Sequence, residues 1–440
     1  MKTLKIYQIL LLFFLFSITF VIFYPILNAN YARIDDFVLL SSYSGALKDI
    51  SLKYIINTFT HYHEGLYHPL VTLSYSLETT LFGFIPAIFH LDNILLHIIN
   101  IVFIFLIFFK LSNSFWLSFL ISTFFAIHPT RTEVVCWISA RKDLMYALFY
   151  LLSIFTYIKT YEKKNIIFWI TVSILFYLLS CLSKSMAITL PFTLFLIDFY
   201  TNHFNMKKLV IYPTYIAITF FFIFITFNSH YSDIVHIRFH FDVFRQFINF
   251  ISAHFNILFY LDKLFLPINL YCMYPYFYDE FASLPPWYIM NSPAILYILI
   301  YLSFLSLKIT KVIFYGFIFF LISIIPVSSV FPIGDFVVAD RYTYIPYLGL
   351  FFIFAKLITY LYERNVKFIK VITISLCLII FVILNYLTYN RVLDWQANNY
   401  SAPSQMKYYE FGIKKRVTCK ITKTQDKNSR LIFKTRFISR

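Results

Sequence analysis

Two adjacent carboxylates, Asp35 and Asp36, follow the first apolar stretch of the chain. If that stretch, Ile6–Leu27, crosses a membrane, both carboxylates lie at its far surface, where they are ionised. A carboxylate in this place can take a proton from an incoming hydroxyl group as a new bond forms. The structural alternative is a helix cap, in which an aspartate accepts hydrogen bonds from the first amides of the next helix. Two carboxylates exceed what a cap needs, so the pair is the first candidate for chemistry, with Asp36 favoured as the base.

Many of the other polar and ionisable side chains lie at the same ends of the apolar stretches as the aspartate pair. They are His61, His63, Glu64, His68, His128, Glu133, Asp143, Lys184, Asp335, Asp340 and Arg341. Transporters tend to bury their polar sites near the bilayer midplane, so this one-sided ring instead predicts a reaction in a cavity at the outer face. For any single member, the alternative is a charge that lies in water at the end of a span.

A polar stripe marks the start of the second apolar stretch. His90, Asn93, His97 and Asn100 recur at steps of three, four and three residues, which places them on one helical face. Such a stripe would be costly against lipid, so it faces protein or a wet cavity. Substrate contact and hydrogen bonding between helices both fit this pattern.

The composition is that of a polytopic membrane protein. Of the 440 residues, 60% are hydrophobic and only 13% are charged, and the mean hydropathy is +0.73. The net charge of +16 is distributed between apolar stretches and in the C-terminal tail, which favours membrane head groups over nucleic acid as the partner. The five cysteines show no CxxC spacing and predict neither a disulfide framework nor a zinc site.

Eleven apolar stretches are long enough, or nearly long enough, to span a membrane. They are Ile6–Leu27, Ile88–Phe109, Phe115–Ile127, Leu144–Tyr157, Ile166–Leu182, Met186–Phe199, Leu209–Phe227, Ala294–Leu307, Val312–Val327, Tyr347–Tyr360 and Val371–Leu387. The first is interpreted as an uncleaved helix, because it is longer than the apolar core of a signal peptide. The segment Phe244–Leu266 predicts an amphipathic helix on the outer surface, with a twelfth span as the alternative.

Lysine and arginine residues in the short loops mark the cytoplasmic side. This orientation predicts a transmembrane domain over residues 1–388, with a first outer loop at 28–87 and an outer segment at 228–293. The remainder, 389–440, is a basic tail with twelve Lys and Arg against three Asp and Glu. Its predicted outer position conflicts with the positive-inside rule, so either the tail is translocated regardless or one predicted crossing is wrong.

Several segments carry recognisable motifs, among them Tyr67-His-Pro-Leu-Val-Thr-Leu-Ser, Leu182-Ser-Lys-Ser and Ala339-Asp-Arg-Tyr-Thr-Tyr-Ile-Pro. Together with Asp35-Asp36 and the segments 82–83, 89–100, 128–143, 326–329 and 388–395, they resemble the membrane half of the transmembrane-and-tetratricopeptide-repeat O-mannosyltransferases and their bacterial relatives. The resemblance covers roughly residues 28 to 400 and implies an all-α, C-type glycosyltransferase fold of about eleven transmembrane helices, with amphipathic helices in a catalytic first outer loop. Ser185 replaces the glutamate usual after Lys184, and the helical repeats expected after Trp395 are absent.

The resemblance implies a donor sugar, mannose or another hexose, carried on a polyprenyl phosphate. The acceptor is a hydroxyl group of a protein or glycan, and direct displacement inverts the anomeric centre. One of Asp35 and Asp36 is then the base, and the other orients the acceptor or the sugar. The expected place is the outer face of a bacterial inner membrane. The paired acids and the phosphate are also compatible with a divalent cation, although the sequence shows no complete ligand set.

Cations near the head-group plane are needed to stabilise the phosphate that leaves. The candidates are Arg341, Lys184, Arg141 and Lys142, with Arg131 as a further one. The candidate substrate-binding residues are His128, Glu133, His68, His97, Asp340 and Tyr342. For each cation the alternative is a topology determinant or a head-group contact, and His128 and Glu133 can instead cap the following helix. No metal site is predicted from His61, His63 and His68, because no definite carboxylate partner follows from the sequence.

Two other functions remain open. A transporter or lipid flippase predicts charges in the middle of broken spans, whereas few ionisable residues lie there in this chain. A catalytically inactive scaffold of the same fold would keep the spans and lose the chemistry. Substitution of both aspartates separates these functions, because only an enzyme loses turnover while it still folds.

Overall fold

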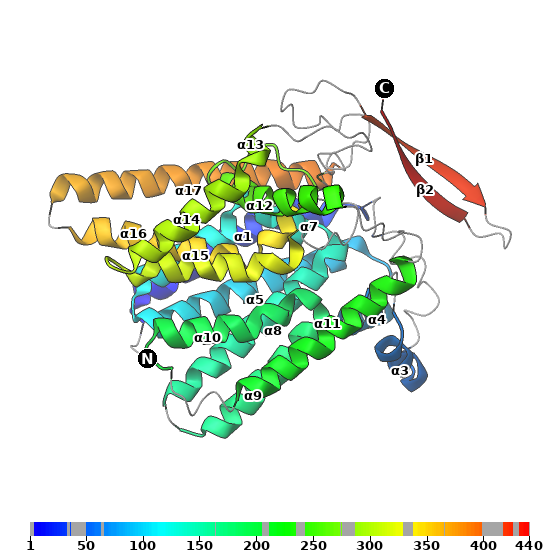
Figure 1. Ribbon diagram of the computed structural model, residues 1–440, viewed down its shortest axis with the longest axis horizontal. Helices are drawn as coiled ribbons and strands as arrows, with labels where there is room; N and C mark the ends of the chain where they lie inside the picture. Colours follow the sequence, from blue (N-terminus) through cyan, green and yellow to red (C-terminus); the bar gives the residue numbers. More distant parts are fainter. Residues whose placement is uncertain are drawn as a thin grey trace.

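The computed structural model describes residues 4–32, 36, 50–62, 66–162, 164–204, 211–234, 243–272, 274, 287–328, 338–364, 366–397, 417–425 and 431–439. These residues form a bundle whose long helices run roughly along the longest axis of the molecule (Figure 1). Helix α5 (Pro86–Ser112) runs from the polar stripe at one end of the bundle to Lys110 at the other. The bundle therefore has two chemically different ends.

All eleven apolar stretches predicted from the sequence are helical in the described residues. Besides α5, the helices are α1 (Ile6–Phe23) continued by η1 (Tyr24–Asn28), α6 (Phe115–Ile127), α8 (Arg141–Lys159), α9 (Ile166–Ser183), η5 (Ser185–Thr189) with α10 (Leu190–Tyr200), α11 (Tyr212–Ile234), α14 (Ser292–Ser306), α15 (Lys311–Ile324) with η7 (Ile325–Val327), α16 (Tyr347–Glu363) and α17 (Lys367–Gln396). Their ends differ from the predicted ones by a few residues, except at the C-terminus of α11 and at both ends of α17. Helices satisfy every main-chain polar group internally, as a bilayer core requires.

Six helical segments in the described part of the chain are long and apolar enough to cross a membrane. They are Ile6–Asn28, Pro86–Ser112, Ile138–Glu162, Ile166–Ser183, Tyr212–Ser229 and Lys367–Gln396. Shorter apolar helices accompany them, including Phe115–Ile127 and Lys311–Val327. The chain is thus a polytopic integral membrane protein whose described bundle is all-α, as predicted, whereas the number of eleven or twelve crossings stays a prediction.

The spans differ in how deeply they lie in the bundle. In the segment Ile138–Glu162, 61% of the most apolar window is buried, whereas in Lys367–Gln396 only 11% is buried. Helix α8 is therefore central, and α17 presents most of its surface outward. Exposed side chains such as Leu378 and Val382 on α17 suit contact with lipid.

Four further helices lie outside the predicted spans. Helices α3 (Leu52–Thr60) and α4 (Pro69–Phe82) belong to the predicted first outer loop, and α12 (Val243–Phe265) and α13 (Trp287–Met290) to the predicted outer segment. Helix α12 confirms the predicted helix at 244–266, and it exposes Phe247 and Phe250 while it buries Asn256. Its position relative to the membrane stays a prediction.

The segment 128–143 connects α6 to α8 through η2 (Pro129–Arg131), α7 (Thr132–Cys136) and η3 (Ile138–Ala140). Nearly all of its side chains are buried, and it contacts α5, α17 and η8 (Asp340–Thr343). A polar loop that is buried in this way must satisfy its charges internally. This requirement shapes the candidate site.

The bundle is also closed by an unusually close crossing of α15 and α16. A Cβ atom added to Gly316 would lie 2.5 Å from the carbonyl oxygen of Gly349, and one added to Gly349 would clash with the carbonyl oxygen of Gly316. Small residues allow helix backbones to approach at such a crossing. Neither glycine can therefore carry a side chain without separation of the two helices.

The C-terminal region differs in two ways from the sequence-based prediction. Helix α17 continues past residue 388 to Gln396, because Thr388, Val392 and Trp395 are buried on one helical face. Beyond it, β1 (Val417–Gln425) and β2 (Leu431–Ser439) form an antiparallel pair, in which Val417 lies opposite Ser439. No strand was predicted in the basic tail.

Candidate active site

Asp36 connects the first outer loop to the buried segment 128–143. Its Oδ1 atom accepts hydrogen bonds from the backbone nitrogen of Ser139, at 2.8 Å, and from the Ser139 hydroxyl, at 2.5 Å. Its Oδ2 atom accepts one from the backbone nitrogen of Ala32, at 3.0 Å. Asp36 is fully buried, and its charge contributes, after burial, to raising the pKa of Tyr31 to about 12. These contacts suit a positioning role, and Asp35 lies outside the described residues.

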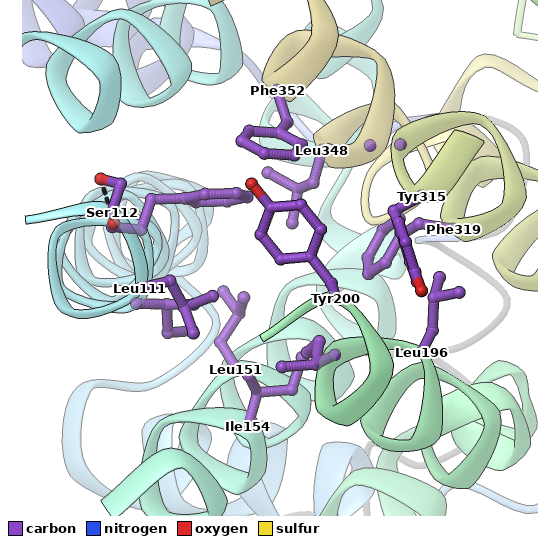
Figure 2. Close-up of a pocket in the computed structure, with 15 residues that line it drawn as sticks. Leu111, Ser112, Leu151, Ile154, Leu196, Tyr200, Tyr315, Phe319, Leu348 and Phe352 are labelled. Carbon is purple, nitrogen blue, oxygen red and sulfur yellow. Dashed lines mark hydrogen bonds between the residues drawn. The ribbon is translucent and has the colours of Figure 1, made fainter. Parts of the chain in front are cut away.

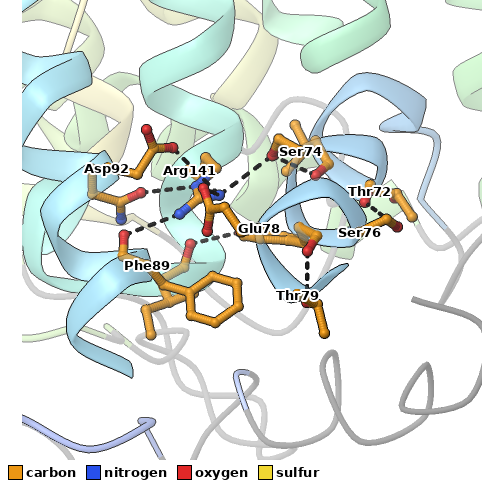
Figure 3. Close-up of polar contacts among 12 residues, drawn as sticks. Thr72, Ser74, Ser76, Glu78, Thr79, Phe89, Asp92 and Arg141 are labelled. Atoms are coloured by element: carbon orange, nitrogen blue, oxygen red, sulfur yellow. Dashed lines mark hydrogen bonds and ion pairs between the residues drawn. The ribbon is translucent and has the colours of Figure 1, made fainter. Parts of the chain in front are cut away.

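Arg141, predicted to bind phosphate, lies at the centre of a network between α4, α5 and α8 (Figure 3). Its Nη1 atom donates to Glu78 at 2.5 Å and lies 3.4 Å from Asp92. Its Nε atom donates to Asn93 at 3.1 Å, and Nη2 donates to the carbonyl oxygen of Phe89 at 3.0 Å. Arg141 is fully buried, so it fixes the helices rather than presenting a free fork to a ligand.

Arg341 and Glu133 form an ion pair across 208 residues of sequence. The Nη1 atom of Arg341 lies 2.5 Å from Glu133 Oε1, and the backbone nitrogen of Arg341 donates to Oε2 at 2.8 Å. Burial acts to lower the pKa of Arg341, but Glu133, Tyr342 and Asp143 together outweigh it and keep that pKa above its usual value. Arg341 retains an exposed fraction of 8%. The guanidinium group is therefore charged, and a small part of the side chain stays accessible to a ligand.

Lys184 lies next to this pair. Its Nζ atom is 2.5 Å from Asp143 Oδ1, so the acidic partner of the lysine comes from α8 and not from position 185, where the sequence has a serine. The ring of Tyr342 lies 5.3 Å from Lys184 Nζ and 5.0 Å from the guanidinium carbon of Arg341. The structure thus brings Lys184, Arg341 and Tyr342 together, as predicted residues of one site.

Arg391 belongs to the same cluster. It was not among the predicted site residues, although its segment, 388–395, was among the recognised motifs. Its Nη1 atom donates to the carbonyl oxygen of Leu270, and Nη2 lies 3.6 Å from Asp340 Oδ2. Within the described ranges, the buried Nε and Nη2 atoms of Arg391 have no hydrogen-bond partner. Buried donors without acceptors are rare and point to a missing partner.

Asp340 completes the cluster. The hydroxyl of Tyr274 donates to its Oδ1 atom at 3.1 Å. Burial raises the pKa of Asp340 to about 7, although Arg391 acts to lower it. The carboxyl group is therefore partly protonated near neutral pH, which reduces the negative charge beside Arg391.

Three other predicted residues have structural contacts. His128 caps η2, with Nδ1 3.4 Å from the backbone nitrogen of Thr130 and Nε2 3.2 Å from the carbonyl oxygen of Leu264. His97 is 2.7 Å from the Tyr344 hydroxyl, and Arg131 donates to the Tyr344 carbonyl oxygen at 2.8 Å. All three are buried. The alternatives of helix capping for His128 and of contact between helices for His97 describe these contacts well.

His68 and Lys142 lie at helix starts. His68 is the N-cap of α4, and Lys142 is in the first turn of α8; both are partly exposed. His61 is described and exposed, whereas His63, Glu64 and Asp335 lie outside the described residues. In the described part of the chain, no three His, Cys, Asp or Glu side chains gather as a metal site would require.

The comparisons with known proteins agree with the motifs. Protein O-mannosyl-transferase TMTC2 of Homo sapiens is 41% identical over 95 residues, which cover 21% of this chain and 11% of that protein. This chain is similar in sequence to protein O-mannosyl-transferases. Protein O-mannosyl-transferase TMTC4 of Homo sapiens is 34% identical over 143 residues, 28% of this chain and 19% of the relative, and TMTC3 of Homo sapiens is 29% identical over 126 residues, 28% and 14%.

The predicted resemblance to O-mannosyl-transferases is thus confirmed over part of the sequence. The matched regions span less than a fifth of the length of each of these three relatives. No family model matches the chain.

Proposed function

We propose that this chain is a glycosyltransferase that moves a sugar, mannose or another hexose, from a polyprenyl phosphate to a hydroxyl acceptor. The observation that carries the proposal is the cluster of Arg391, Arg341 and Lys184 at one end of the bundle, where, among the described residues, the buried Nε and Nη2 atoms of Arg391 have no hydrogen-bond acceptor. A lipid phosphate brings two or more acceptor oxygens to the head-group plane. The similar proteins are named protein O-mannosyl-transferases, which supports the same reaction class.

The donor phosphate is proposed to lie against Arg391, with Arg341 and Lys184 beside it. An arginine fork can grip two phosphate oxygens at once, which a lysine cannot do. Glu133 and Asp143 already balance Arg341 and Lys184 at 2.5 Å, so the phosphate adds its charge mainly to Arg391. A protonated Asp340 limits the repulsion on the phosphate.

The acceptor hydroxyl is proposed to reach the anomeric carbon from the side of the first outer loop. The proton of the hydroxyl passes to a carboxylate as the new carbon–oxygen bond forms. At the same time the bond between the anomeric carbon and the phosphate oxygen breaks, and the electron pair of that bond leaves with the polyprenyl phosphate. One displacement inverts the anomeric centre. Because Asp36 is buried and bonded to Ser139, we assign the base to Asp35 and the positioning of the loop to Asp36.

The proposed acceptor is a serine or threonine of a protein, or a glycan hydroxyl. The proposed location is the outer face of a bacterial inner membrane, the side opposite Lys110 and Lys311 under the positive-inside rule. A divalent cation would add to the positive charge around the phosphate, so a chelator belongs in the assay.

The test uses membranes that contain the full chain, and empty membranes as the control. Each is given a radiolabelled hexose either as polyprenyl phosphate sugar or as nucleotide sugar, with and without chelator. Label should enter protein or glycan from the polyprenyl donor only, and only in membranes with the chain. Equal label in both membranes for every donor would overturn the proposal and leave a transporter or an inactive scaffold.

A further inference from the structure

The end of the bundle far from Arg341 and Arg391 contains a second site of a different kind. A narrow apolar cavity of about 90 Å³ lies between α5, α8, α10, α15 and α16. It is smaller than the roughly 300–1,000 Å³ that is usual for small-molecule pockets. Leu111, Leu196 and Phe352 line it, and Tyr200 lies across its middle (Figure 2). The lining carries almost no polar groups, so the cavity suits a hydrocarbon chain.

A polar pocket adjoins this cavity at the end of the bundle. Leu111 and Tyr200 line both spaces, so the two share a wall. The polar pocket is lined by Lys110, Lys311, Glu162, Asn202 and His203 together with Tyr161. A polar pocket beside an apolar cavity offers an amphiphile a place for its head group and a place for its chain.

The two lysines give the polar pocket its charge. Lys110 Nζ lies 2.6 Å from Glu162, which is 63% exposed, and Lys311 Nζ donates to Asn202 Oδ1 at 3.0 Å. An ion pair with so exposed a partner contributes little to stability. A phosphate can therefore replace Glu162 at Lys110 at low cost and also reach Lys311, whose partner is neutral.

A buried carboxylate holds the wall of the polar pocket. Asp198, which is fully buried, accepts hydrogen bonds from the hydroxyls of Tyr161 and Tyr157, each at 2.7 Å. The ring of Tyr161 stacks on His203, with 4.0 Å between ring centroids. The backbone nitrogen of His203 also donates to the carbonyl oxygen of Asp198 at 2.9 Å. The pocket is thus organised by the fold before any ligand binds.

We infer that this end of the bundle binds an anionic phospholipid, with its phosphate at Lys110 and Lys311 and part of one acyl chain in the apolar cavity. The positive-inside rule places the lysines on the cytoplasmic side, where anionic lipids are concentrated. The lipid would fill the space between α5, α10 and α15 and so brace the bundle from the face opposite the candidate active site. This inference does not depend on the reaction proposed above.

The test measures how much phosphatidylglycerol the purified full chain retains, by native mass spectrometry, after transfer from mixed phosphatidylglycerol and phosphatidylcholine vesicles into detergent. Wild-type protein should retain phosphatidylglycerol in preference to phosphatidylcholine. The double variant Lys110→Gln/Lys311→Gln should retain about tenfold less, because each lysine near an anionic head group contributes to its binding. Lys308→Gln is the matched control, since Lys308 is exposed on the same side and does not line the pocket.

A second pair of variants tests the apolar cavity. Leu196→Trp should fill the cavity and lower retention, whereas Phe195→Trp, at a side chain that is 40% exposed on the same helix, should not. Glycerol phosphate, which has a head group and no chain, should not displace the bound lipid. The inference is overturned if all variants retain phosphatidylglycerol equally, if phosphatidylcholine is retained equally well, or if glycerol phosphate competes as well as the lipid.

Discussion

Arg391 is the residue on which the account of the donor site rests. Its neighbours Arg341 and Lys184 each have a carboxylate at 2.5 Å, whereas the carboxylate oxygen that pairs with Arg391 within the described residues is at 3.6 Å. A phosphate that binds at Arg391 need not displace a carboxylate in close contact, as it would at Arg341 or Lys184. The negative charge of the phosphate is therefore stabilised most at Arg391.

Substitution of Arg391 should therefore impair the donor step. Arg391→Lys keeps the charge and loses the planar fork, and we expect kcat/KM for the polyprenyl donor to fall by about 100-fold, as when one preorganised donor is removed. Arg364→Lys, at an exposed arginine at the end of α16, should change it less than about twofold. Transfer at the wild-type rate by Arg391→Lys would exclude Arg391 as the phosphate ligand.

Asp340 should make stability depend on pH. Its folded pKa is raised to about 7 by burial, so between its ordinary value and about 7 the folded state holds a proton that the unfolded state has released. The contribution of Asp340 to the free energy of unfolding is therefore fully present below its ordinary pKa. It is lost as the pH rises through about 7. We expect the thermal midpoint in detergent to fall over this range, and to fall less in Asp340→Asn.

The control for this prediction is Asp262→Asn, at a side chain that is 52% exposed on α12. This variant should keep the pH dependence of the wild type. If Asp340→Asn and the wild type show the same fall in thermal midpoint, the burial of Asp340 does not control stability.

The helices themselves could be predicted from the sequence, because an apolar run in a membrane protein has few alternatives to a helix. The stretches 115–127 and 166–182 match α6 and α9 almost residue for residue. The partners of the charged residues could not be predicted. Glu133 and Arg341 meet across 208 residues, and no periodicity within a helix encodes such a pairing.

The sequence placed some of the clustered residues in one site, and their binding roles stay predictions. Lys184, Arg341 and Tyr342 were expected and do lie together, whereas Arg141 and Arg131 carry the same charge and are used to hold helices. Residue type alone cannot distinguish these roles, because burial depends on the packing of distant segments. Arg391 was missed for a related reason, since the predicted last span ended before it and the helix continues to Gln396.

The contact between Asp36 and η3 should hold the first outer loop on the bundle. Ser139→Ala removes the hydroxyl that donates to Asp36 at 2.5 Å, and we expect a loss of about 1.5–3 kcal/mol, as for a hydrogen bond to a charged group. Ser303→Ala is the matched control, because in the described part of the chain its hydroxyl bonds to the carbonyl oxygen of Ile300 within its own helix. Equal unfolding midpoints for both variants would contradict this role.

The crossing of α15 and α16 should tolerate no added carbon. Gly349→Ala places a Cβ atom against the backbone carbonyl oxygen of Gly316, which cannot turn aside as a side chain would. We expect a loss of about 1–3 kcal/mol from overpacking, measured by thermal unfolding in detergent. Leu357→Ala, at a side chain that is 50% exposed on the same helix, should have a smaller effect, and the reverse order would contradict the close crossing.

The whole molecule divides its chemistry between its two ends. The end that carries Asp36, Glu133 and Arg341 gathers paired charges around a buried loop, and the end that carries Lys110 and Lys311 has a polar pocket beside an apolar cavity. Between them, the described helices bury polar but uncharged groups, such as Asn100, Ser153 and Ser173. A transporter is expected to carry charged groups at mid-depth, so the paired charges at one end fit better an enzyme that acts at one membrane surface.

The measurement that tests the central claim most directly is sugar transfer from a radiolabelled polyprenyl phosphate donor to endogenous acceptors in membranes. Wild-type chain, Asp35→Asn, Asp36→Asn and empty membranes are compared at matched expression, with thermal unfolding as the folding control. We predict that Asp35→Asn folds normally and loses transfer, and that Asp36→Asn loses both stability and transfer. Equal incorporation in all four membranes, with several donor sugars tried, would contradict the account and leave the similarity as one of sequence alone.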